Sequence, residues 1–216
     1  MALIVVTVSA SFGAGGSRVA PVVAERLGVP FHDRAIPREV ARRLAVPEEA
    51  AVEQEENPPR GVARWLSAMV SLGGGLPGGA VPPAPELLLD PVAYRRHADA
   101  TLRGFAEGGG VLLGRAGAVA LADWPGALHV RLDGPSAARL AAAKAWGRAE
   151  GENVESVMRE ADRAREGYVR HFYGRDARDP GLYHLVLDST ALGLGGAVQV
   201  IVAAAKARAA VLAETR

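Results

Sequence analysis

Short apolar runs alternate with segments of helical periodicity along most of the chain. The β-branched run Leu3–Val8 predicts a buried strand, and the apolar stripe of Gly15–Leu27 predicts a helix. Further strands are expected at 31–33, 111–113, 127–132 and 183–187, and further helices at 38–44, 47–55, 91–107, 136–148, 153–172 and 197–212. This alternation indicates an α/β protein with a mainly parallel sheet and helices on both faces.

Glycine and proline interrupt the alternation from Asn57 to Pro85, apart from an apolar patch at 62–72 where a short helix around Trp65 is expected. Long irregular segments of this kind are usually functional or disordered. We therefore expect a single domain over residues 1–216 that carries a flexible insertion at 57–90.

Composition narrows the class of protein. With 216 residues, 49% of them hydrophobic, the chain can bury a sizeable core. It has no cysteine, which excludes disulfides and thiol chemistry, and its formal charge of +1 without a basic tract argues against nucleic acid as a partner. The first apolar run is too short for a secretory signal, and no segment resembles a membrane span of about 20 apolar residues. We expect a cytoplasmic protein that binds small molecules.

A glycine-rich turn lies between the first strand and the first helix. Such a turn can point several backbone N–H groups at one phosphate. The dinucleotide pattern G-x-G-x-x-G fails because its third glycine falls on Arg18. The P-loop pattern G-x-x-x-x-G-K-[ST] fits better: Ala10 stands at its first glycine, Gly15 at its second and Ser17 at its hydroxyl residue. Its lysine position is occupied by Gly16. The turn is a phosphate site or a plain tight turn, and Arg18 is a substitute cation or a solvated helix residue.

Two further positions fall at the carboxyl ends of strands, where ligands bind in parallel sheets. Arg115 follows the strand 111–113, where a guanidinium could hold a phosphate bidentately or close the sheet edge with a salt bridge. Position and chemistry together favour phosphate binding. Asp33 ends the strand 31–33 and could meet a nucleotide base or sugar.

The helix 153–172 carries a charged face. Arg159, Arg163, Glu166 and Arg170 recur at helical spacing. Such a face is typical of a solvated charge ladder, but it would also suit a lid whose cations close on a transferred phosphate. The histidines are scattered without the spacing of a metal site.

Taken in order, these segments resemble the cytidylate kinase-like family. Residues 5–20 resemble its opening, in which an F-G-[SA]-G-G turn replaces a complete Walker loop, and residues 27–34 are similar to its L-G-[IV]-P-[FY]-x-D-[KR] segment. Residues 111–116 resemble its strand ending in Gly-Arg, and residues 168–187 resemble its late motif. The likeness spans nearly the whole chain and is weakest at 57–91.

The resemblance implies a three-layer P-loop nucleoside-monophosphate-kinase fold, with a parallel five-stranded sheet of order 2-3-1-4-5 and a helical lid at 150–180. It implies transfer of the γ-phosphate of ATP, with Mg²⁺, to CMP or dCMP. The donor nucleotide and its metal would be bound by Ser11, Gly13, Ala14, Gly15, Gly16 and Ser17, with Ser17 as the magnesium ligand. The acceptor would be bound by Asp33 and Arg115, and the catalytic cations would be Arg18, Arg163 and Arg170.

Two departures from the family pattern bear on activity. Gly16 removes the bridging lysine, and Ala116 stands where cytidylate kinase carries an aspartate after Gly-Arg. Because lysine occurs only at 144 and 206, arginine would have to complete the site. The alternatives are a non-catalytic nucleotide or anion sensor on the same fold, and a partner-binding module that uses the Trp65 patch. A homo-oligomer is left open.

Overall fold

The computed structural model describes residues 3–33, 91–114, 116–147 and 153–214. Five strands form one sheet: β1 (Val5–Ala10), β2 (Phe31–Asp33), β3 (Gly110–Leu113), β4 (Leu128–Asp133) and β5 (Leu185–Asp188). Their order is β2-β3-β1-β4-β5 and all four pairings are parallel. The predicted fold class and strand order are therefore confirmed.

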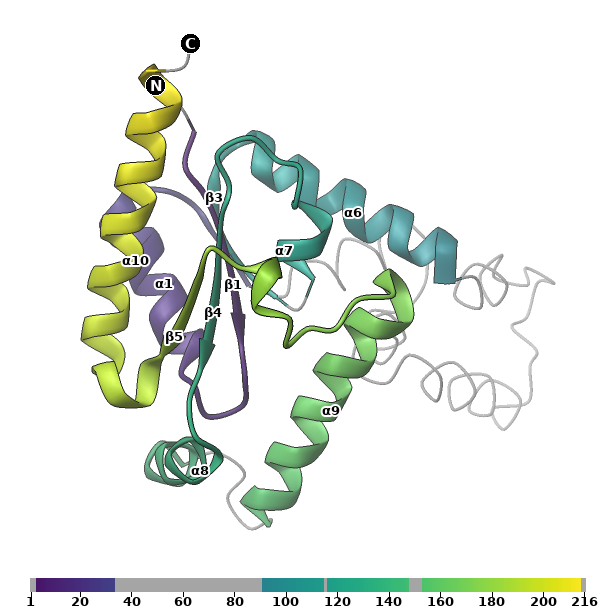
Figure 1. Ribbon diagram of the computed structural model, residues 1–216, viewed down its shortest axis with the longest axis vertical. Helices are drawn as coiled ribbons and strands as arrows, with labels where there is room; N and C mark the ends of the chain where they lie inside the picture. The colour runs from purple at the N-terminus through teal and green to yellow at the C-terminus, as the bar shows by residue number, and fades with distance from the viewer. Residues whose placement is uncertain (1–2, 34–90, 115, 148–152, 215–216) are drawn as a thin grey trace, which may run out of the picture.

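Helices cover both faces of the sheet (Figure 1). On one face lie α1 (Gly16–Leu27) and α10 (Ser189–Glu214), and on the other lie α6 (Pro91–Glu107), the short α7 (Gly117–Ala120) and α9 (Val154–Tyr173). α8 (Ser136–Ala145) lies beyond the carboxyl ends of β1 and β4, where one end of α9 also lies. A 3₁₀ turn, Pro180–Leu182, precedes β5.

The core divides into two large clusters because the sheet is apolar on both faces. One cluster joins β1, β3 and β4 to α1 and α10, and includes Val8, Val23, Val130 and Ile201. The other lies under α6, α7 and α9. A third, small cluster packs Phe12 against Ala143 of α8 and Met158 of α9. This last cluster fixes both helices over the turn that follows β1.

The sequence predicted most of the described elements closely, but it placed the last helix too late. α10 begins at Ser189 rather than Ala197 and is interrupted by non-helical geometry at Gly193. The earlier start makes α10 long and apolar enough to cross a membrane by length and composition, which corrects the expectation that no such segment exists. In this structure, Ala197, Val198, Ile201 and Ala205 of α10 are buried in the core beside α1 and β4.

Several expectations fall outside the part of the chain that the structure describes. They are the helices at 38–44 and 47–55, the Trp65 patch, the insertion at 57–90, and the placement of Arg115. Asp33 is described as the last residue of β2, without its side chain.

A buried histidine pair joins β4 to the segment before β5. His129 is 4% exposed, its Nδ1 lies 2.9 Å from Thr7 Oγ1, and its ring stacks on His184. The backbone N–H of His129 donates to His184 Nδ1 at 2.9 Å. Burial, with a smaller contribution from His184, lowers the pKa of His129 from 6.5 to about 4. His129 is therefore neutral in the folded protein at neutral pH.

This shift predicts acid sensitivity. Below pH 6.5 the unfolded chain binds a proton at His129 that the folded protein does not, so the free energy of unfolding should fall as pH drops toward 4. The loss attributable to this group is about 3 kcal/mol. Urea titrations of wild type and His129→Gln at pH 7 and pH 4.5 measure it, because glutamine does not titrate. An identical pH dependence in the two proteins would contradict the assignment.

Candidate phosphate-binding site

The turn Ser11–Gly15 connects β1 to α1 at the carboxyl edge of the sheet. Gly13 and Gly15 both have φ of 77°, a left-handed conformation that favours glycine. The turn closes on itself through Ala14 N–H, which donates to Ser11 O at 3.1 Å. Ser11 N–H donates to Leu132 O of β4 at 3.1 Å, so the turn is also tied to the neighbouring strand.

Tight packing explains why three glycines are needed here. A Cβ atom on Gly13 would lie 2.2 Å from the carbonyl oxygen of Arg139, and one on Gly15 would lie 2.5 Å from Leu194 Cδ2. A Cβ atom on Gly16 would lie 2.5 Å from the methyl carbon of Ala10. Ala10 occupies the first glycine position of the P-loop pattern, and its methyl group takes up the space that a side chain at 16 would need. The chain therefore differs from the P-loop pattern at two positions that touch: alanine replaces the smaller glycine on β1, and glycine replaces the larger lysine at the start of α1.

Backbone N–H groups of the turn are poised to bind an anion. Gly13, Gly15 and Gly16 are buried, and their N–H groups have no acceptor among the described residues. Buried backbone donors normally have a partner, so three such donors within four residues and without a described acceptor indicate a candidate ligand position. The 12-residue helix α1 begins at Gly16, and its positive dipole end adds to the attraction for a phosphate.

Asp162 of α9 holds the outer part of the turn. Its Oδ1 accepts the N–H of Phe12 at 2.8 Å, and its Oδ2 accepts Arg139 Nη1 at 2.7 Å. Arg139, on α8, also donates to Phe12 O at 2.8 Å and to Gly134 O at 2.9 Å. The arginine and the carboxylate therefore clamp the turn between α8 and α9.

Arg131 supplies a second cation beside the turn. Its guanidinium donates to Ser11 Oγ at 3.1 Å, to Asp133 Oδ2 at 2.9 Å and to Ala177 O at 2.8 Å. Burial raises the pKa of Asp133, but hydrogen bonds and charge from Arg131 outweigh it and hold that pKa below its ordinary value. Asp133 is therefore ionised at neutral pH. Ser189 Oγ–H, from the start of α10, donates to Ala14 O at 2.8 Å and completes the frame of the turn.

Comparison with known proteins identifies the family. A sequence model of the Cytidylate kinase-like family matches residues 5–191. The chain belongs to this family. No curated protein sequence matches the chain.

One solved structure supports the fold, and two others are less similar. An uncharacterized protein from Eubacterium ventriosum ATCC 27560 is 15% identical with a TM-score of 0.64, over 94% of this chain and 98% of that one. Shikimate kinase from Bacteroides thetaiotaomicron is 14% identical with a TM-score of 0.48, over 93% of this chain and 96% of that one. Shikimate kinase from Acinetobacter baumannii in complex with shikimate is 16% identical with a TM-score of 0.44, over 93% and 94% of the two chains.

In this cytidylate kinase-like protein, the predicted loop residues lie in the turn and in the first two residues of α1: Ser11, Gly13, Ala14 and Gly15 in the turn, and Gly16 and Ser17 in the helix. Arg18, in the first turn of α1, is exposed, and its guanidinium carbon lies 5.0 Å from the centroid of the Trp146 ring. Whether Ser17 holds a metal stays a prediction. The described residues contain no group of three or more His, Cys, Asp or Glu side chains that could hold an ion without help from a ligand.

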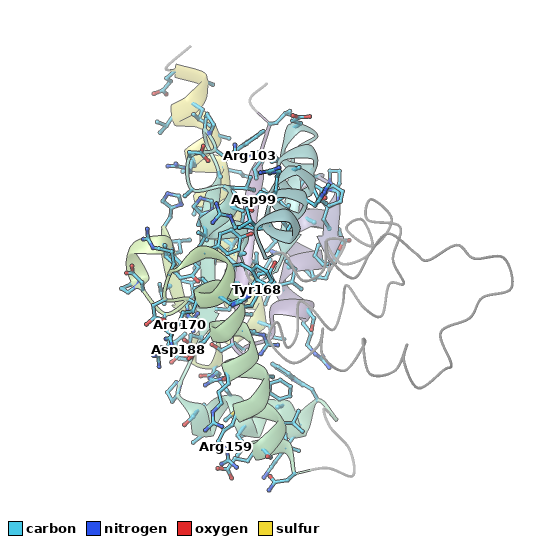
Figure 2. The ribbon with its side chains drawn as sticks, turned by 90° about the vertical axis from the view of Figure 1, so that its right-hand side faces the viewer. Asp99, Arg103, Arg159, Tyr168, Arg170 and Asp188 are labelled. Atoms are coloured by element: carbon cyan, nitrogen blue, oxygen red, sulfur yellow. The ribbon has the colours of Figure 1, made fainter. Side chains whose placement is uncertain are left out.

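The structure does not bring the predicted lid arginines to the turn. Arg163 and Arg170 are exposed on α9, and the described contacts do not link either one to the turn. Figure 2 shows Arg159 and Arg170 near opposite ends of this helix. A different charged residue of α9, Asp162, contacts the turn through Phe12 N–H, and its Oδ1 also accepts Arg165 Nη1 at 3.2 Å. That Arg163 and Arg170 act as lid cations on a bound ligand stays a prediction.

The acceptor side of the predicted site is partly described. Asp33, at the end of β2, is in register with Leu113, and Gly114 N–H donates to Val8 O of β1 at 3.1 Å. The position of Arg115 lies just beyond this, outside the described residues. The ends of β2, β3 and β1 therefore share one edge, as the prediction for Asp33 and Arg115 requires.

Sequence reasoning missed the residues that hold the turn. Arg131 and Asp133 have the alternate spacing of one strand face at the end of β4, and this signal could have drawn attention to them. Asp162 lies one helical turn after Met158, which packs on Phe12. No local pattern distinguishes Arg139 from the other arginines of the chain.

Proposed function

We propose that this member of the cytidylate kinase-like family is a phosphotransferase that binds the phosphates of ATP in the turn Ser11–Gly15 and transfers the γ-phosphate to a nucleoside monophosphate. CMP and dCMP are the first acceptors to test. The observation that supports this most is the set of buried N–H groups of Gly13, Gly15 and Gly16, which have no acceptor among the described residues, at the start of α1.

The chain's own residues would supply the charge that phosphoryl transfer requires. Transfer of a phosphoryl group depends mainly on positioning and on electrostatic stabilisation. Arg131 and Arg139 lie at the turn, largely buried, and both are held by carboxylates and carbonyl oxygens. In this proposal each guanidinium forms a fixed dipole with its aspartate near the phosphates, and these preorganised dipoles act in place of the lysine that Gly16 replaces. Arg18 is a further cation in the first turn of α1.

Mg²⁺ fits the donor chemistry of the turn. Protein sites for this ion usually contribute one or two oxygen ligands and leave the rest to phosphates and water. Ser17, in the first turn of α1, would contribute its hydroxyl oxygen. When bound, the ion would neutralise charge that develops on the phosphate oxygens.

A direct assay tests the proposal. Release of ADP from ATP should be measured with CMP, dCMP, UMP and AMP in turn, with the largest turnover expected for CMP or dCMP. Arg131→Ala should lower kcat/KM by about 100-fold, the usual loss when one stabilising donor is removed. Arg159→Ala, which removes an exposed arginine paired with Glu155, should leave it unchanged. No turnover with any of the four acceptors would contradict the proposal.

The alternative is a nucleotide or anion sensor without catalysis. Gly16 and the buried Ala116, at the start of α7, favour it because both replace charged residues of cytidylate kinase. It predicts that calorimetry detects ATP binding while no acceptor is phosphorylated. Kinase activity that disappears in Arg115→Ala would exclude the sensor.

A further inference from the structure

An aromatic side chain lies beside the phosphate-binding turn. Trp146 follows α8 directly and is half-buried. A Cβ atom placed on Gly15 would lie 3.3 Å from Trp146 Cη2 and 2.5 Å from Leu194 Cδ2. The indole ring and the leucine, which comes just after the kink in α10, therefore meet at the glycine that precedes α1.

Arg18, in the first turn of α1, contacts the indole ring of Trp146. Its guanidinium carbon lies 5.0 Å from the ring centroid, within the range of a cation–π contact. Arg18 is exposed and lies two residues after the first residue of α1. An aromatic plane and a guanidinium group thus lie next to each other at the end of the turn, close to solvent.

Aromatic and guanidinium planes are the surfaces on which proteins stack nucleobases. If phosphates bind on the N–H groups of this turn, the nucleoside attached to them lies beside residues that flank the turn. In this chain those residues are Ser17 and Arg18, and Trp146 is the aromatic ring beside them.

We propose that Trp146 and Arg18, whose guanidinium group lies over the indole ring, together form the stacking platform for the base of the donor nucleotide. This inference rests on the proposed function. Every base has a π-face that can stack, so a stacking platform favours bases with a larger ring surface and does not read their hydrogen-bonding pattern. The donor is therefore a purine nucleoside triphosphate, with ATP and GTP bound similarly and CTP and UTP bound less tightly.

The other two tryptophans allow a clean optical test. Trp124 lies after α7 and packs against the core cluster beneath α6, α7 and α9. Trp65 is the third tryptophan of the chain. A Trp65→Phe/Trp124→Phe protein would report from Trp146 alone. Titration with ATP or GTP should quench its fluorescence, whereas inorganic tripolyphosphate, which has no base, should bind without comparable quenching.

Affinity measurements complete the test. By calorimetry, Trp146→Ala should weaken ATP binding about tenfold, the usual loss for one base–aromatic stack, and should leave tripolyphosphate binding unchanged. Trp146→Phe should recover most of the loss, and Trp124→Phe should show none. Thermal melts of each variant exclude unfolding as the cause.

The outcomes separate this inference from the function on which it rests. If ATP binds wild type and Trp146→Ala with affinities within twofold of each other, the stacking role is overturned while the phosphate site stands. If Trp146→Ala weakens ATP and tripolyphosphate binding equally, Trp146 is a structural support of the turn and the stacking role is again overturned. If wild type binds neither ligand, the proposed function fails and this inference fails with it.

Discussion

Gly13→Ala is expected to destabilise the protein by about 3 kcal/mol and to abolish phosphate binding. Two costs add at this position. An alanine must adopt φ of 77°, and its Cβ atom would lie 2.2 Å from the carbonyl oxygen of Arg139 and 2.8 Å from its carbonyl carbon. Because the obstructing atoms belong to the backbone of α8, they cannot move aside as a flexible side chain would. Either the turn or α8 must shift, and either shift disturbs the N–H groups of the turn.

Gly28→Ala is the matched control. Gly28 has φ of 67°, close to that of Gly13, but an added Cβ atom would meet nothing within 4 Å. Its cost should be the conformational part alone, about 1 kcal/mol. Urea denaturation of both variants gives the two free energies of unfolding, and calorimetry with tripolyphosphate gives the effect on binding. Equal destabilisation by the two substitutions would show that α8 does not pack on the turn as described.

Arg139→Ala should produce the second large effect. The side chains of Arg139 and Asp162 are 11% and 20% exposed, and the Nη1–Oδ2 distance is 2.7 Å. Truncation leaves the carboxylate of Asp162 with Arg165 and the N–H of Phe12 as its described partners, and takes a donor from Phe12 O and Gly134 O. Removing one partner of a buried ion pair costs more than the pair contributes, so we expect a loss of about 3 kcal/mol in the free energy of unfolding.

A pair on the same helix calibrates this expectation. Arg159 and Glu155 of α9 are also linked at 2.8 Å, but their side chains are 53% and 55% exposed. Arg159→Ala should cost no more than about 0.5 kcal/mol. Adding Asp162→Asn to Arg139→Ala should restore part of the loss, because the remaining partner is then neutral. A double-mutant cycle without coupling between Arg139 and Asp162 would contradict the proposed clamp.

Local sequence determined the described helices and strands and the position of the glycine turn between β1 and α1. The β-branched run of β1, the glycine turn after it and the apolar stripe of α1 are each encoded within a few residues. Asn153 caps α9, and its side chain accepts the N–H groups of Glu155 and Ser156 at 3.1 and 3.3 Å. Such features can be read directly because propensity, periodicity and capping depend on near neighbours. The family's order of motifs then supplied the strand order.

Tertiary structure decided how the turn is completed. The sequence shows only that glycine stands at the lysine position of the P-loop pattern. The fold shows that the methyl group of Ala10 occupies the space that a side chain at Gly16 would need. Phe12 N–H meets Asp162 across 150 positions, and Arg131 meets Ser11 across 120 positions. No periodicity encodes such contacts, because they arise only when the sheet brings β1 and β4 together and α8 and α9 close over their ends. The sequence alone therefore predicted a phosphate site at this turn, whereas long-range packing determined which arginines and which carboxylate lie at the turn.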